Sequence, residues 1–224
     1  MERKHMSQDA LAVLRATPYF QDLPPAALAD LAAQATERTY ARGELILLEG
    51  ERARAVYLVV RGQVRAYKLS PEGRQQVLDR LGPGQSFNLV PVLDGLPNPA
   101  SVEAVNQATV LALPAGVFRD VLRRHPAVAQ AVLADLAGRV RRLATLVEDL
   151  SLRTVRARLA RYLLRQAQQP GRRLTQAEMA AELGTVRDVI GRALADFEAE
   201  GLIAIDRHRI VVKNRRGLEE RAQV

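Results

Sequence analysis

The sequence predicts an α+β protein with an N-terminal antiparallel β-roll, one long helix and a C-terminal winged helix-turn-helix. Three observations support this class: short apolar runs cut by glycines from 37 to 114, a heptad-like apolar repeat from 129 to 150, and two helix starts on either side of Gly184. The expected divisions are the β-roll at 1–125, the long helix at 126–150 and the winged helix-turn-helix at 151–224.

The first part of the chain changes from helical to strand-like spacing. Residues 24–34, PPAALADLAAQ, carry leucine and alanine at helical spacing and predict a short helix. From Glu37 to Pro114 the chain consists of short runs rich in Val, Leu and Tyr, separated by glycines and by turn signals such as Pro-Glu-Gly at 71–73. Runs of this length between turn residues favour an antiparallel sheet.

An apolar repeat predicts the long helix. From Ala129, apolar or small side chains recur in steps of four and three, the spacing of a coiled-coil seam. The large members of this repeat are Leu133, Leu136, Val140, Leu143, Val147 and Leu150. Such a narrow stripe favours a partner helix, and a second copy of the chain related by two-fold symmetry is the simplest partner. The alternative is a helix that lies on the core of its own domain.

The helix-turn-helix is predicted from capping signals. A helix at 155–168 ends in a loop that contains proline and glycine, and Thr175 and Glu178 then have the spacing of a capping box. Leu174 and Met179 occupy the two positions of a hydrophobic staple. The first helix of the motif therefore begins at Thr175.

A glycine turn separates the two helices of the motif. Gly184 supplies the left-handed conformation that ends the first helix. Thr185 is expected to cap a second helix that runs to about Glu200 and stops at Gly201. Two helices joined by such a short turn, with the small Ala180 where they cross, form a helix-turn-helix.

The second helix of the motif has two different faces. Its expected inner face consists of Val186, Ile190, Ala193, Leu194 and Phe197. Its outer face consists of Arg187, Asp188, Gly191, Arg192 and Ala195. In this motif the N-terminal end of the second helix enters the major groove. Arg187 and Arg192 can each donate two bonds to guanine, and Asp188 can accept from cytosine. Alternatively, Asp188 completes a second capping box with Thr185, or pairs with Arg192 on a solvated surface.

The chain after Gly201 predicts a hairpin wing with a polar turn at 206–209. We expect phosphate contacts from the wing tip and from both helix starts, and Gly191 allows a close approach to the groove. These backbone-contacting residues are Thr175, Gln176, Thr185, Gly191, Arg207, His208 and Arg209. Only Tyr162 and Phe197 are aromatic in this domain, which argues against single-strand stacking and favours double-stranded DNA.

Positive charge gathers toward the C-terminal end. Residues 151–224 contain 15 Lys and Arg against 9 Asp and Glu, a net charge of +6, whereas residues 1–150 contain 18 against 16, a net charge of +2. A basic small domain attracts polyanions, and the phosphate backbone is the most common of these. The alternative is an arginine-rich surface that is only solvated.

Composition argues against several other classes of protein. The chain has no cysteine, which removes disulfides, thiolate metal sites and thiol nucleophiles. No Ser-His-Asp order, HExxH, Walker or GxGxxG pattern occurs, so we expect no enzyme and no metal site. No apolar run approaches the roughly 18 residues of a membrane span, and we expect a cytoplasmic protein without membrane contact.

The order of these parts resembles the Crp/Fnr superfamily of bacterial transcription regulators. The segments RGELILLEGE, VYLVVRGQVRAY and LTQAEMAAELGTVRDVIGRALADFEAEGLI carry the resemblance. It implies a homodimeric activator that binds a palindromic promoter site with half-sites similar to TGTGA, together with RNA polymerase as a partner. Arg187, Asp188 and Arg192 match the family's Arg-Glu-x-x-x-Arg pattern with Asp in place of Glu, so the base preference opposite Asp188 stays open.

The β-roll departs from the cyclic-nucleotide-binding members of this family. Asn88-Leu89 stands where those members carry Gly-Glu, and Pro99-Ala100 stands where they carry Arg-Ser. A cyclic phosphate buried without its cation would be poorly paired, so cyclic AMP is not expected. The Fnr iron–sulfur cluster is excluded by the lack of cysteine. We expect no cofactor and no known effector, with a roll switched by a small molecule, either a cyclic nucleotide or a gas-sensing haem, as the alternative.

Overall fold

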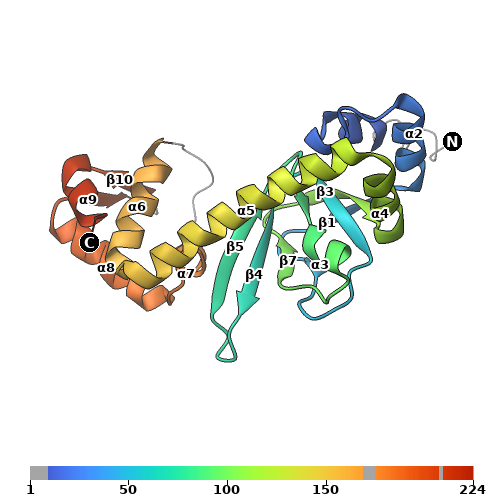
Figure 1. Ribbon diagram of the computed structural model, residues 1–224. Coiled ribbons are helices and arrows are strands. Elements are labelled where there is room, and N and C mark those ends of the chain that lie inside the picture. Colours follow the sequence, from blue (N-terminus) through green and yellow to red (C-terminus); the bar gives the residue numbers. More distant parts are fainter. Residues whose placement is uncertain (1–9, 169–174, 207–208, 224) are drawn as a thin grey trace. The chain divides into compact units, whose positions relative to one another are not determined.

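The computed structural model describes residues 10–168, 175–206 and 209–223. The chain divides into two compact units. The first unit contains Met1–Lys68 and Asp79–Val140, and the second contains Leu69–Leu78 and Arg141–Val224. The predicted α+β class is confirmed, with a β-rich part followed by the long helix and a helical part (Figure 1).

Two four-stranded antiparallel sheets form the β-roll. In the first sheet the strand order is β1 (Thr36–Tyr40), β8 (Ala108–Pro114), β3 (Ala55–Arg61) and β6 (Ser86–Phe87). In the second sheet the order is β2 (Leu45–Leu47), β7 (Ser101–Ala104), β4 (Val64–Leu69) and β5 (Gln75–Leu81). The turn between β4 and β5 is the predicted Pro-Glu-Gly turn, where Gly73 has a φ of +81°.

The two central strands of the first sheet, β3 and β8, bury side chains on both faces. Val59 and Val110 point into the roll, where they meet side chains of the second sheet such as Val102. Leu58 and Leu111, each next to one of these valines in its strand, point to the opposite face. Because side chains alternate along a strand, a sheet that is buried on both sides reads as a continuous apolar run, as Val56–Val60 does.

Helices cover the outer face of the first sheet (Figure 1). They are η1 (Pro18–Phe20), α2 (Pro25–Gln34), α4 (Ala115–Arg124) and the first part of α5 (Pro126–Leu152). The short helix α3 (Leu89–Asp94) follows β6. The helix predicted at 24–34 is confirmed as α2, and Pro25 occupies its first turn, where its missing N–H costs nothing.

The second unit contains a small helical core and a two-stranded wing. Its elements are α6 (Val155–Gln168), α7 (Gln176–Glu182), α8 (Arg187–Ala199), β9 (Ile203–Asp206), β10 (Arg209–Val212) and α9 (Arg215–Arg221). Leu159, Ile190 and Phe197 are fully buried in this core. The sequence did not predict α9, which begins at Asn214 with a side-chain cap to Gly217 N and buries Leu218.

A buried arginine of α6 caps the C-terminal end of the long helix α5. Arg158 of α6 is 8% exposed and donates to the carbonyl oxygens of Asp149 and Leu150, which lie in the last turn of α5. These carbonyls lack partners within their own helix, so a cation there stabilises the helix end. Burial lowers the pKa of Arg158, and the Asp149 carboxylate opposes that shift. Among the described helices, none has the length and apolar character needed to cross a membrane.

Candidate nucleic-acid interface

The first helix of the motif begins as its sequence predicts. Thr175 Oγ1 accepts from Glu178 N at 3.2 Å, and Thr175 N donates to Glu178 Oε2 at 2.7 Å. The predicted capping box is therefore confirmed. Leu174, the other half of the predicted hydrophobic staple, lies outside the described residues. A firm start to α7 fixes Thr175 and Gln176 at one end of the motif.

The turn between α7 and α8 requires glycine. Gly184 has a φ of +63°, and a Cβ atom on it would lie 2.6 Å from Leu150 Cδ2. Any other residue would be strained in that conformation and would displace Leu150. Leu150 is thus packed against the helix-turn-helix of its own unit, although the sequence places it in the apolar seam of α5.

The second helix begins one residue later than predicted. Its N-cap is Val186, in an extended conformation with φ −109° and ψ 155°, and no side chain caps it. The predicted cap by Thr185 is wrong, because the N–H of Thr185 bonds back to Ala180 O and holds this residue in the turn. The second capping box between Thr185 and Asp188 does not form.

The prediction that Val186 lies on the inner face is also wrong. It is 42% exposed, because helical spacing does not apply to an extended residue before the helix. The other predicted inner residues are confirmed as buried, and they are Ile190, Ala193, Leu194 and Phe197.

The outer face of α8 carries the predicted charges. Arg187, Asp188 and Arg192 are exposed, and their side chains make no hydrogen bond or ion pair with any other described residue. The Arg192–Asp188 pair, considered as an alternative, is thus not formed. Gly191 lies beside α7, since a Cβ atom on it would meet Gln176 Oε1 at 3.5 Å. The outer face of α8 therefore lies next to the start of α7.

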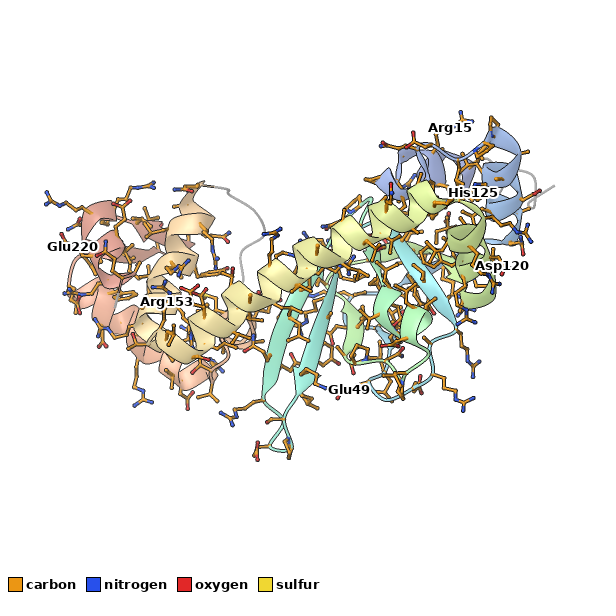
Figure 2. All side chains as sticks on the ribbon, viewed as in Figure 1. Arg15, Glu49, Asp120, His125, Arg153 and Glu220 are labelled. Carbon is orange, nitrogen blue, oxygen red and sulfur yellow. The ribbon has the colours of Figure 1, made fainter. Side chains whose placement is uncertain are left out.

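Several other arginines of the second unit are paired with carboxylates. Arg156 donates to Asp196 Oδ2 at 2.8 Å and to Glu200, and its guanidinium lies 5.2 Å from the Phe197 ring centroid. Hydrogen bonds from Arg156 first, and from Arg221, lower the pKa of the Glu200 carboxyl. Arg153, labelled in Figure 2, bonds Asp149 Oδ1 at 2.9 Å. These arginines are thus paired with carboxylates of their own unit.

The predicted wing is confirmed as a hairpin. β9 and β10 pair in antiparallel register, with Asp206 opposite Arg209. Ile205 N donates to Glu198 Oε1 at 2.7 Å, which ties the wing to the end of α8. Arg209 is exposed, whereas Arg207 and His208 lie outside the described residues.

The apolar seam of α5 is partly covered and partly exposed. Leu133, Val140 and Val147 are 64%, 65% and 61% exposed, and Leu143 is 43% exposed. Leu136 packs against the core of the first unit. Large apolar side chains at heptad spacing that remain exposed on one helix are typical of a surface that binds another helix.

Both ends of the chain match family models. Residues 37–125 match a cyclic nucleotide-binding domain, and residues 157–221 match a Crp-like helix-turn-helix domain. The cyclic AMP receptor protein of Thermus thermophilus is 32% identical over 210 residues, which cover 92% of this chain and 97% of that protein. The chain belongs to the Crp/Fnr family of transcription regulators.

Two further comparisons agree with the Crp/Fnr assignment. The CRP-like cAMP-activated global transcriptional regulator of Mycobacterium tuberculosis is 28% identical over 221 residues, covering 94% of this chain and 99% of that protein. A crystal structure of a Crp/Fnr-family regulator from Eubacterium rectale superposes with a TM-score of 0.82 at 24% identity, covering 94% of this chain and all of that one. The family predicted from the sequence is therefore confirmed.

In this Crp/Fnr protein, polar groups of the roll bond to one another at positions where the sequence departs from nucleotide-binding members. Asn88 has a φ of +67°, and its Nδ2 donates to Ala55 O at 3.0 Å. Lys68 Nζ pairs with Glu49, labelled in Figure 2, and donates to Pro99 O at 3.0 Å. Asn88 and Pro99 are two of the positions at which the sequence departs from nucleotide-binding members. This role of Lys68 could not be predicted, because its partner Glu49 lies 19 residues away in the sequence.

Proposed function

We propose that this chain is a homodimeric regulator that binds a palindromic promoter site in a sequence-specific manner, with half-sites similar to TGTGA. One observation carries the proposal. Arg187 and Arg192 are exposed without partners in the described chain, whereas Arg153 and Arg156 of the same unit are bound to carboxylates. Two free guanidinium groups on one helix of a helix-turn-helix suit base recognition in the major groove.

The chemistry of each side chain gives it a role at the DNA. Arg187 and Arg192 would each donate two hydrogen bonds to guanine, and Asp188 would accept from the amino group of cytosine. Contacts to phosphate would hold the register of the motif on the duplex. The residues proposed for that role are Thr175, Gln176, Thr185, Gly191, Arg207, His208 and Arg209.

The exposed seam of α5 supports a two-fold dimer. Leu133, Val140, Leu143 and Val147 would meet the same residues of a second copy, as a two-fold interface requires. Two copies would present two α8 helices to half-sites about one helical turn apart. Leu136 and Leu150, which pack partly against their own units, would contribute less to this interface.

We propose further that the regulator acts without a cyclic nucleotide. The names of two relatives include cyclic AMP, and residues 37–125 match a domain of that type. In this chain the Lys68 cation is paired with Glu49, and Pro99 offers only its carbonyl oxygen. A buried cyclic phosphate would lack a free cation. RNA polymerase is the expected partner at the promoter.

Selection from a random pool of duplexes tests the DNA-binding proposal. The purified protein should enrich a palindrome, and light scattering should give the mass of two chains in solution and on the DNA. A protein that enriches no common sequence, or that remains a single chain on its site, would contradict the proposal.

Calorimetry decides between the two views of the roll. Titration with cyclic AMP and cyclic GMP should give no binding heat at micromolar concentration. Binding of either nucleotide would favour the alternative, a roll switched by a small molecule. The haem alternative predicts a Soret absorption band after haem is added, which we do not expect.

A further inference from the structure

Val186 is an exposed apolar residue in a position that helices reserve for polar side chains. Among the described residues from Val155 onward, the exposed large hydrophobic side chains are Val186 at 42% and Ile205 at 39%. Both belong to elements that the proposed function places against DNA, the start of α8 and the wing.

Local stability does not explain this valine. Ser, Thr, Asp and Asn are strongly preferred at the N-cap because their oxygen accepts from the first-turn amides, and valine is among the poorest residues there. The chain shows the preferred solution at Thr175, only eleven positions earlier. Burial does not compensate, since Val186 is 42% exposed. A local rule broken without a structural gain is typical of a functional position.

We propose that the Val186 side chain contacts the C5-methyl group of a thymine in the major groove, beside the guanine that Arg187 reads. This inference rests on the proposed function. The N-terminal residues of the second helix are those that reach base edges in this motif, and Val186 immediately precedes Arg187. A valine side chain cannot hydrogen-bond to phosphate or to a base. The apolar group that the major groove offers is the thymine methyl.

Removal of single methyl groups from the DNA tests this contact. In the duplex selected by the wild-type protein, each thymine of the half-site is replaced in turn by deoxyuridine, in both half-sites at once. Fluorescence anisotropy at fixed salt gives the Kd of each duplex. At one thymine beside a guanine, the wild-type protein should bind about fifteenfold more weakly, since burial of one methyl is worth about fourfold in each half-site.

Three variants separate this contact from an effect on folding. Val186→Ala should bind the thymine and deoxyuridine duplexes equally at that position. Val186→Ser should do the same while its thermal stability rises, because serine supplies the missing cap. Ile205→Ala is the matched control, since it removes the other exposed apolar side chain and should keep the full sensitivity to deoxyuridine.

The outcomes distinguish this inference from the proposed function. The inference is wrong if no thymine position affects the wild-type protein, if the selected half-site has no thymine beside a guanine, or if Val186→Ala keeps the wild-type sensitivity. In each of these cases a preference for the selected duplex over a scrambled one would still support the proposed function. Equal binding to the scrambled duplex would overturn both.

Discussion

The two halves of α5 contain similar apolar residues but differ in what covers them. Val128 and Val132, in the first two turns, are each 2% exposed and belong to the core of the first unit. Val140 and Val147, further along the same helix, are 65% and 61% exposed. Valine thus stabilises the fold where α5 faces the core of the first unit and is exposed further along, on the side of the helix that also carries Leu133, 64% exposed.

The arginines of the molecule show a similar division. Arg139 donates to Asp135 Oδ2 at 2.9 Å and to Ser86 Oγ at 3.1 Å, within a network that also holds the hydroxyl of Tyr19. Arg187 and Arg192 have no such partners in the described chain. Paired side chains therefore indicate where the fold is held together, and Arg187 and Arg192 remain available for the proposed contact with DNA.

The largest change in stability is expected from a charge placed in the part of α5 that faces the core of the first unit. Val132→Asp would bury a carboxylate without a partner among Leu28, Phe118 and other apolar side chains. We expect the free energy of unfolding to fall by about 3–5 kcal/mol. Chemical denaturation measures it, and Val147→Asp is the matched control that should leave unfolding of the single chain nearly unchanged. Equal destabilisation by both variants would contradict the division of the helix.

The second prediction concerns dimer formation through the exposed valines of α5. The double variant Val140→Asp/Val147→Asp would place two carboxylates per chain in the proposed interface, facing those of the partner. Dissociation should become easier by about 3 kcal/mol or more, since each buried valine contributes about 1.5–3 kcal/mol. Sedimentation at micromolar concentration should show a single folded chain. A variant that retains the mass of two chains would place the interface elsewhere.

The third prediction compares Arg187, which has no partner in the described chain, with Arg156, which is paired with carboxylates. Arg187→Ala should weaken binding to the selected site by about 1–3 kcal/mol and relax selectivity at one base pair. Arg156→Ala is the control, because Arg156 is bound to Asp196 and should affect stability more than selectivity. If Arg187→Ala weakened binding to random DNA by the same amount, Arg187 would contact only the backbone.

The parts of this fold that follow from local spacing could be predicted from the sequence. The helix at 24–34, the capping box at Thr175 and the glycine turn at Gly184 each depend on residues within a few positions of one another. The wing likewise depends on a short polar turn between two apolar runs. These interactions depend on nearby residues, so periodicity and capping rules can predict them.

Predictions from the sequence differ from the structure where contacts outside the capping and heptad patterns decide the outcome. α8 begins after Val186 because Thr185 N bonds back to Ala180 O, and Leu150 of the predicted seam packs beneath Gly184. Repeats show which residues are apolar and do not show which neighbour covers them. The ion pair of Lys68 with Glu49 joins β4 to the turn after β2, and neither residue lies near the other in the sequence.

The smallest predicted effect concerns the network that holds the covered half of α5. Tyr19 Oη donates to Asp135 Oδ2 at 2.5 Å and lies 2.7 Å from Ser86 Oγ. Burial, followed by the hydrogen bond to Asp135, raises the pKa of Tyr19 to about 12. In the unfolded chain a tyrosine titrates near 10. The neutral phenol is therefore favoured by folding, and its contribution is fully present below about pH 10 and lost as the pH rises toward 12.

The expected size of this pH dependence follows from the two pKa values. Between about pH 9 and pH 11, Tyr19 should account for a fall of about 1.4 kcal/mol in the free energy of unfolding. Tyr19→Phe should remove that share of the slope, and it should also cost about 1–2 kcal/mol at neutral pH, because Asp135 loses a donor. Burial also raises the pKa of Tyr57, so wild type and variant are compared over the same range. If their slopes were identical, Tyr19 would not hold its proton against Asp135, and α5 would be fixed to the first unit by its apolar contacts alone.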